Sequence, residues 1–170
     1  METRINRIRR YSKSKEEQNW RFRSFLKTYG SDEIDAIVHR LYREVSAEID
    51  CRACGNCCKE ILPLLDEGDM ERLANGLGIS IAELKEQYLV KDDDGKYTFN
   101  SVPCPFLKNN VCSCYDYRPE NCVSYPHIHK EGFVFRLMGV IDNCSVCPIV
   151  YNVYEQLKRE VWHNRSTGYY

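Results

Sequence analysis

The highest density of potential metal ligands lies in the segment CRACGNCC, residues 51–58, which places four cysteines within eight positions. Cys51, Cys54 and Cys57 have the C-x2-C-x2-C spacing, which lets successive thiolates wrap one inorganic cluster. Bacterial ferredoxins complete such clusters with a remote cysteine followed by proline, and this chain offers Cys104-Pro105 and Cys147-Pro148. The spacing therefore favours a [4Fe-4S] iron-sulfur cluster as the cofactor.

The adjacent pair Cys57 and Cys58 needs a separate explanation. Neighbouring side chains in extended backbone point to opposite sides, so two adjacent thiolates are poorly placed to bind the same metal atom. We expect one of them to join the Cys51 and Cys54 site and the other to reach cysteines of later loops. The alternative is that Cys58 is a small buried hydrophobic residue.

Zinc is the alternative metal. The two C-x2-C pairs, Cys51 with Cys54 and Cys144 with Cys147, suit a tetrahedral zinc site of four thiolates, and zinc can hold together loops that lack their own core. His127 and His129 alternate in a polar stretch, which is more typical of a turn or short strand than of ligation. The predicted metal ligands are Cys51, Cys54, Cys57, Cys58, Cys104, Cys112, Cys122, Cys144 and Cys147.

The composition and the N-terminal sequence together predict the cellular compartment of the protein. Ten cysteines and an N-terminus without the apolar core of a secretory signal predict a cytoplasmic protein, where thiols stay reduced and hold metal. No apolar run is long enough to span a bilayer, so no membrane partner is expected. The net charge of -1 gives no general attraction to nucleic acid, and a basic N-terminal run is typical of a solvated terminus. That run contains Arg4, Arg7, Arg9, Arg10, Lys13 and Lys15.

Helical patterns surround the cysteine segments. We expect a helix over 14–29, and a second one capped by Ser31 that leads the chain to Cys51. Next comes a helix over 66–76, which Gly76 and Gly78 are expected to break. A capping box at Ser80–Glu83 then begins a further helix. We predict a turn and a strand over 91–99, and a second strand over 132–140. Pro148 is expected to begin a final helix.

Three segments of the chain resemble one family. CRACGNCC, VPCPFL and VCSCYDYRPENCVSYP are similar to the YkgJ-type cysteine-cluster proteins, which are described as zinc- or iron-chelating domains and as Fe-S-cluster-containing proteins. The family pattern runs C-x2-C-G-x-C-C, then C-P-F-L, then C-x-I-Y-x-x-R-P-x-x-C. Cys114 stands where the family has an aliphatic residue, so we expect it to be an extra thiol and not a ligand. The matching residues are Cys51, Cys54, Gly55, Cys57, Cys58, Cys104, Pro105, Phe106, Leu107, Cys112, Tyr115, Arg118, Pro119, Cys122 and Pro126.

The resemblance implies a metal-binding protein and leaves its activity open. Electron transfer, redox sensing or cluster handling with an unknown redox or protein partner is one hypothesis, and a zinc-stabilised interaction module is another. The cysteine pattern also resembles that of flagellin lysine-N-methylases, which use S-adenosylmethionine, but the chain lacks a Gly-rich nucleotide fingerprint. Arg118 is a candidate cofactor-binding residue that hydrogen bonds near cluster sulfurs, or else one that binds loop carbonyls.

The expected architecture is a mainly helical α+β fold in which the cysteine-rich loops converge on a metal site. Residues 1–50 form an N-terminal helical extension in this scheme. Residues 51–150 form the cysteine-cluster domain, and residues 151–170 form a C-terminal helix and tail packed with it. The loops at 51–58, 104–122 and 144–147 are expected to meet, because a shared site needs sulfurs from all of them.

Overall fold

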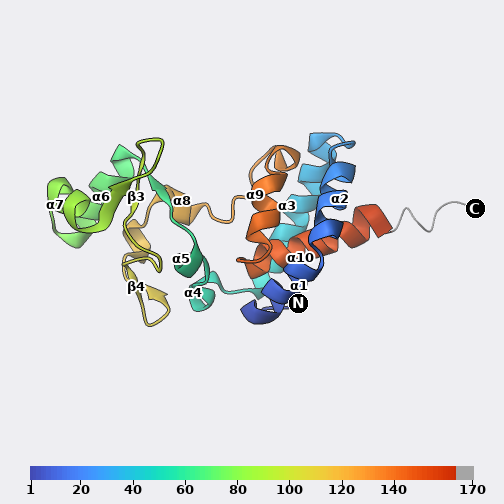
Figure 1. Cartoon of the computed structure of the whole chain (residues 1–170), viewed down its shortest axis with the longest axis horizontal. Coiled ribbons are helices and arrows are strands. Elements are labelled where there is room, and N and C mark those ends of the chain that lie inside the picture. The colour runs from blue at the N-terminus through green and yellow to red at the C-terminus, as the bar shows by residue number, and fades with distance from the viewer. Residues whose placement is uncertain (164–170) are drawn as a thin grey trace, which may run out of the picture. The chain divides into compact units, whose positions relative to one another are not determined.

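The computed structural model of the chain describes residues 1–163 and divides into two compact units (Figure 1). We call residues 1–50 with 126–163 the helical unit, and residues 51–125 the cysteine unit. The expected mainly helical α+β fold is confirmed. The predicted domain limits stay a prediction, and residues 164–170 of the predicted C-terminal tail lie outside the described residues.

The helical unit is built around the packing of two helices, α3 and α10. Phe22, Ile34 and Tyr154 are almost completely buried in its core. Among residues 1–163, no helix is both long and apolar enough to cross a membrane. The elements of the unit are α1 (Ile5–Ser14), α2 (Glu16–Leu26), α3 (Ser31–Glu48), the 3-10 turn η2 (Phe133–Phe135), α9 (Leu137–Asn143), α10 (Pro148–Leu157) and the π-helix η3 (Lys158–His163).

Most helices predicted for this unit are present. The segment 14–29 contains α2, but it is preceded by α1, which the sequence did not predict. The second helix is confirmed as α3, with Gly30 instead of Ser31 at the N-cap position. The final helix begins at Pro148, as predicted, where the missing N–H of proline costs no hydrogen bond.

The strand predicted over 132–140 is wrong, and a distant side chain explains why. Asp35 of α3 is buried, and its carboxylate accepts hydrogen bonds from the backbone N–H groups of Gly132 and Phe133. These bonds hold the segment in the 3-10 turn η2, after which α9 begins at Leu137. The apolar residues there follow a helical repeat, which so short a run does not distinguish from a strand.

The cysteine unit combines a small sheet, two helices and several single helical turns. The helix α6 (Glu67–Leu77) and the helix α7 (Ile81–Tyr88) pack beside an antiparallel sheet of order β1-β3-β2. Its core holds Leu73, Leu84, Phe99 and Phe106. The other elements are α4 (Cys51–Cys54), α5 (Cys57–Glu60), β1 (Leu64–Leu65), β2 (Leu89–Lys91), β3 (Tyr97–Phe99), the hairpin strands β4 (Leu107–Lys108) and β5 (Val111–Cys112), η1 (Tyr115–Tyr117) and α8 (Glu120–Val123).

The predicted capping box at Ser80 and Glu83 is confirmed at the start of α7. Gly78 ends α6 in the left-handed conformation, whereas Gly76 lies inside the helix and does not break it. Gly76 is needed for a close approach, because a Cβ atom there would lie 2.3 Å from the ring of Tyr117. The helix therefore packs directly on η1, which sits between two cysteine segments.

Candidate metal centre

The segment CRACGNCC folds into two single turns of helix, α4 and α5, joined at Gly55. Gly55 has φ +56°, a conformation that favours glycine, and an added Cβ would lie 3.0 Å from the backbone oxygen of Asn110. All four cysteines of this segment lie on these helical turns, whereas Cys104 lies in a loop and Cys112 ends the strand β5. Glycine at position 55 allows the two turns to lie against the hairpin.

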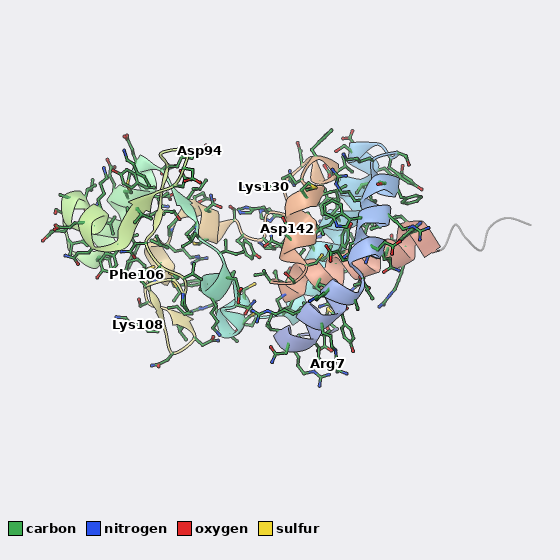
Figure 2. All side chains as sticks on the ribbon, viewed as in Figure 1. Arg7, Asp94, Phe106, Lys108, Lys130 and Asp142 are labelled. Carbon is green, nitrogen blue, oxygen red and sulfur yellow. The ribbon has the colours of Figure 1, made fainter. Side chains whose placement is uncertain are left out.

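The hairpin β4–β5 holds these turns in place through its own turn residues. Asn109 and Asn110 both have positive φ, as a two-residue hairpin turn of this kind requires. The side-chain Nδ2 of Asn110 donates to the carbonyl oxygens of Ala53 at 2.7 Å and of Cys54 at 3.2 Å. Lys108, labelled in Figure 2, belongs to the first strand of this hairpin, and Phe106, also labelled, immediately precedes that strand.

Two further contacts bring the later cysteines to the first segment and to α6. The backbone N–H of Cys104 donates to the carbonyl oxygen of Cys58 at 2.7 Å. The turn α8, which carries Cys122, is attached to α6 because Asp69 accepts the backbone N–H of Glu120 at 2.9 Å. Asp69 is buried and also belongs to the capping box of α6. Hydrogen bonds from backbone N–H groups thus fix three cysteine-bearing segments within one compact unit.

Four thiols from these segments lie within electrostatic range of one another. We call Cys58, Cys104, Cys112 and Cys122 the four-thiol set. Burial raises the pKa of Cys122 to about 12, and negative charge on Cys58, Cys104 or Cys112 raises it further. Burial likewise raises the pKa of Cys104 to about 11, with contributions from Cys58 and Cys112, and Cys58 in turn interacts with Cys112. Every pair in the set therefore interacts.

Hydrogen bonds from neighbouring thiols favour the thiolate at two members of the set. The side chain of Cys57 hydrogen bonds to Cys58 and is the largest cause of the lowering of the Cys58 pKa to about 7. Cys114 has the same effect on Cys112, whose pKa is lowered to about 6. These hydrogen bonds favour the thiolate form at Cys58 and Cys112.

The expectation that Cys57 and Cys58 lie in extended backbone is wrong, because both belong to the helical turn α5. Consecutive helical positions differ by about 100° in direction, so the two side chains diverge less than strand neighbours do. Their thiols also hydrogen bond to each other. The assignment of the pair to separate partners stays a prediction.

Arg118, the predicted cofactor-binding residue, makes the loop-carbonyl contact considered for it, and its role beside a cofactor stays a prediction. Its guanidinium donates to the carbonyl oxygen of Tyr115 and lies 3.6 Å from the centre of the Tyr115 ring. Its positive charge also lowers the pKa of Cys112 and opposes the raised pKa of Cys122. Arg52 lies 4.4 Å from the centre of the same ring. The cysteine unit therefore holds cationic groups beside its thiols.

The remaining predicted ligands are placed as follows. Cys51 is exposed and Cys54 is half-buried on α4. Cys144 and Cys147 belong to the helical unit and are both buried there, and burial strongly raises the pKa of Cys144. His129 also belongs to that unit, with its ring 5.3 Å from that of Tyr42. The ligand roles of these four cysteines, like those of the other five, stay predictions.

The donors of the cysteine unit fit a soft metal. Thiolates are the ligands that zinc and iron-sulfur clusters prefer, and a basic side chain offsets the net negative charge of several thiolates on one metal. Within residues 1–163, no three His, Cys, Asp or Glu side chains already lie in a closed metal-binding arrangement. Coordination by the four-thiol set therefore requires the segments that carry it to close on the metal.

These features make the cysteine unit a candidate thiolate metal centre. A family model matches residues 50–148, more than half of the chain, and its description is CxxCxxCC, "Putative zinc- or iron-chelating domain". The chain belongs to this family of cysteine-cluster proteins. The matched range includes Cys144 and Cys147. Comparison with curated proteins and with solved structures gave no match.

The residues that position the thiols were not predicted from the sequence. Asn110, Asp69 and Gly76 act through contacts with segments far along the chain. The dipeptide Asn109-Asn110 between apolar residues was the one available signal, since it is typical of a hairpin turn. Nothing in its sequence indicates that the second asparagine reaches the carbonyls of α4.

Proposed function

We propose that the chain is a cytoplasmic metalloprotein that holds an iron-sulfur cluster and serves in electron transfer, redox sensing or cluster handling. The observation that carries the proposal is the joining of cysteine-bearing segments by hydrogen bonds, from Cys104 N–H to the carbonyl oxygen of Cys58 and from Glu120 N–H to Asp69, together with the mutual effects of the four-thiol set on their pKa values. Metal binding itself follows from the family. The C-x2-C-x2-C spacing of Cys51, Cys54 and Cys57 supports a [4Fe-4S] form.

The surroundings of the thiols also support a redox role. Hydrogen bonds and charge near cluster sulfurs set the reduction potential of an iron-sulfur cluster. Arg118 interacts with Cys112 and Cys122, so it would stabilise the more negative, reduced form of a cluster bound there. When bound, such a cluster would supply one-electron chemistry, and the residues around it would bind it and adjust its potential.

A zinc-stabilised interaction module is the second candidate. It is supported by the short distance between two sulfurs, since Cys112 Sγ and Cys114 Sγ lie 3.6 Å apart. Two thiolates bound to one tetrahedral zinc ion are separated by about 3.8 Å, given zinc–sulfur bonds of about 2.3 Å. In this case the metal would stabilise the cysteine unit and the surface of that unit would bind the partner.

Purification of the chain without oxygen tests the proposal. We expect a brown protein with broad visible absorption that dithionite bleaches, and with iron and acid-labile sulfide in comparable amounts. The double variant Cys104→Ser with Cys122→Ser should be colourless, because serine replaces a soft thiolate poorly. Colourless wild-type protein with stoichiometric zinc would contradict the iron-sulfur proposal and support the zinc module.

A further inference from the structure

The sequence gives Cys114 no role, since it lies outside the family pattern and was expected to be an extra thiol. The structure places it in direct contact with a predicted ligand, because its Sγ lies 3.6 Å from the Sγ of Cys112. Cys112 ends β5 and Cys114 immediately precedes η1, so the chain turns between them and brings both sulfurs to one side. A regular strand would also direct residues two apart to one face, but at a wider spacing.

The spacing of this pair matches two thiolates that share one metal atom. A disulfide requires sulfurs about 2.05 Å apart, and Cys112 and Cys114 are both free. Tetrahedral coordination with bonds of about 2.3 Å requires sulfurs about 3.8 Å apart. The observed distance needs a change of only a few tenths of an ångström to accept a metal ion, whereas disulfide formation needs a much larger one.

The surroundings of Cys114 place it among other predicted ligands. Its side chain is 2% exposed and packs in the same cluster as Phe106 and Leu73. Cys104 and Cys122 also lie within electrostatic range of it. Cys112 is only half-buried, so a metal ion held by the pair has access from the side of Cys112.

We propose that Cys112 and Cys114 together chelate one soft metal ion, which makes Cys114 a ligand of the metal centre in addition to the four-thiol set. The inference rests on the proposed function only in requiring a thiolate metal centre in the cysteine unit. It identifies the metal at this position as a single ion or as one iron of a two-iron cluster, because each iron of a four-iron cluster takes one cysteine. A four-iron cluster on Cys51, Cys54 and Cys57, completed by a remote cysteine such as Cys104, uses neither sulfur of this pair and is compatible with it.

Cobalt and zinc titrations of the reduced, metal-free full-length chain test the proposal. The informative variant is Cys114→Val, which removes the sulfur and keeps an apolar side chain in the core. Ser113→Ala is the matched control, because it alters the same turn without removing a sulfur. Cobalt reports thiolate ligation by its sulfur-to-metal charge-transfer absorption, and zinc affinity is measured by competition with a coloured chelator.

We expect Cys114→Val to lower zinc affinity at least about tenfold, since even indirect partners of metal ligands contribute 10–100-fold. Its charge-transfer absorption per cobalt should fall, while Ser113→Ala should match the wild type in both measurements. Wild-type affinity and absorption in Cys114→Val would overturn the inference and make Cys114 a core thiol. A wild-type chain that binds neither cobalt, zinc nor iron would overturn the proposed function as well.

A second measurement on the unsubstituted chain covers the case in which Cys114→Val fails to fold. Addition of Zn²⁺ to the ¹³C-labelled protein should shift the Cβ resonances of Cys112 and Cys114 together. A shift of the Cys112 resonance without one at Cys114 would contradict the shared chelate. It would leave the metal centre itself intact, so the two failures are distinguishable.

Discussion

The helical unit and the cysteine unit are stabilised in different ways. Long helices in the helical unit bury large side chains such as Phe22, Tyr154 and Leu157 almost completely. In the cysteine unit the large buried residues belong to α6, α7, the sheet and Phe106, while the short turns α4, α5 and α8 bury none. Those turns carry five of the eight cysteines of the unit, namely Cys51, Cys54, Cys57, Cys58 and Cys122.

The two units therefore differ in what stabilises them, which is burial of apolar side chains in one and contacts between short turns in the other. Burial of apolar area stabilises the helical unit without a metal, at roughly 25 cal/mol per Å². A single turn of helix has too few internal hydrogen bonds to be stable alone, so α4, α5 and α8 depend on contacts with the rest of the unit, and we expect bound metal to add to these contacts. Structural metal can contribute on the order of 10 kcal/mol to folding. We therefore expect metal to matter mainly in the cysteine unit.

The largest expected effect comes from the adjacent cysteines. Cys57→Ser should lower cluster occupancy, as loss of Cys51 or Cys54 would, because serine replaces a soft thiolate poorly. Cys58→Ser should instead reduce hydrogen-exchange protection over residues 104–122, since Cys58 interacts with Cys104 and Cys112. Iron content and exchange rates of both variants check this. Equal loss of iron and of protection in the two variants would refute separate partners for the pair.

A smaller effect, confined to the helical unit, is expected at Lys158. Its side chain is 2% exposed, and its Nζ donates to Glu155 Oε1 at 2.6 Å and to the side chain of Asn19. Lys158→Met leaves the buried side-chain oxygen of Asn19 without this donor, while Glu155 keeps its ion pair with Lys15, so it should lower the free energy of unfolding by about 2 kcal/mol. Urea unfolding measures the loss, with exposed Lys13→Met as control. A fall in metal content with unchanged stability would contradict the division between the units.

The smallest effect is expected at the hairpin turn. Asn110→Gly keeps the positive φ but removes the hydrogen bonds to Ala53 and Cys54, so it should destabilise the cysteine unit by about 1–2 kcal/mol. Asn109→Gly is the matched control, because it changes the same turn and should alter stability by less than about 0.5 kcal/mol. Exchange protection of residues 51–58 distinguishes them. Identical behaviour of both variants would show that the asparagine contact contributes nothing.

Local signals in the sequence predicted much of the fold. The helical repeat of α3, the capping box of α7 and Pro148 at the start of α10 each specify an element through neighbouring residues. The strand prediction for residues 132–140 was wrong because Asp35, nearly a hundred residues earlier, determines the conformation of that segment. Short apolar segments lack the length to reveal their period, so tertiary contacts decide their structure.

The sequence predicted the chemical class of the candidate site but not the contacts and turns that position its thiols. Cysteine spacing identified a metal-binding segment, and the family match confirms metal chelation as its class. The adjacent thiols were expected to diverge, but α5 places Cys57 within hydrogen-bonding distance of Cys58. Cys114 was set aside from the pattern, yet it contacts Cys112. Both differences arise from local backbone turns that residue spacing alone does not specify.

Hydrogen exchange of the full chain with and without its metal tests the central claim most directly. Metal should be removed by a strong chelator under reducing conditions, and peptides from both units compared in one experiment. We predict that protection falls over residues 51–58 and 104–123, while α3 and α10 keep theirs. Equal protection of the cysteine segments in the two states would contradict a metal centre built from these thiols.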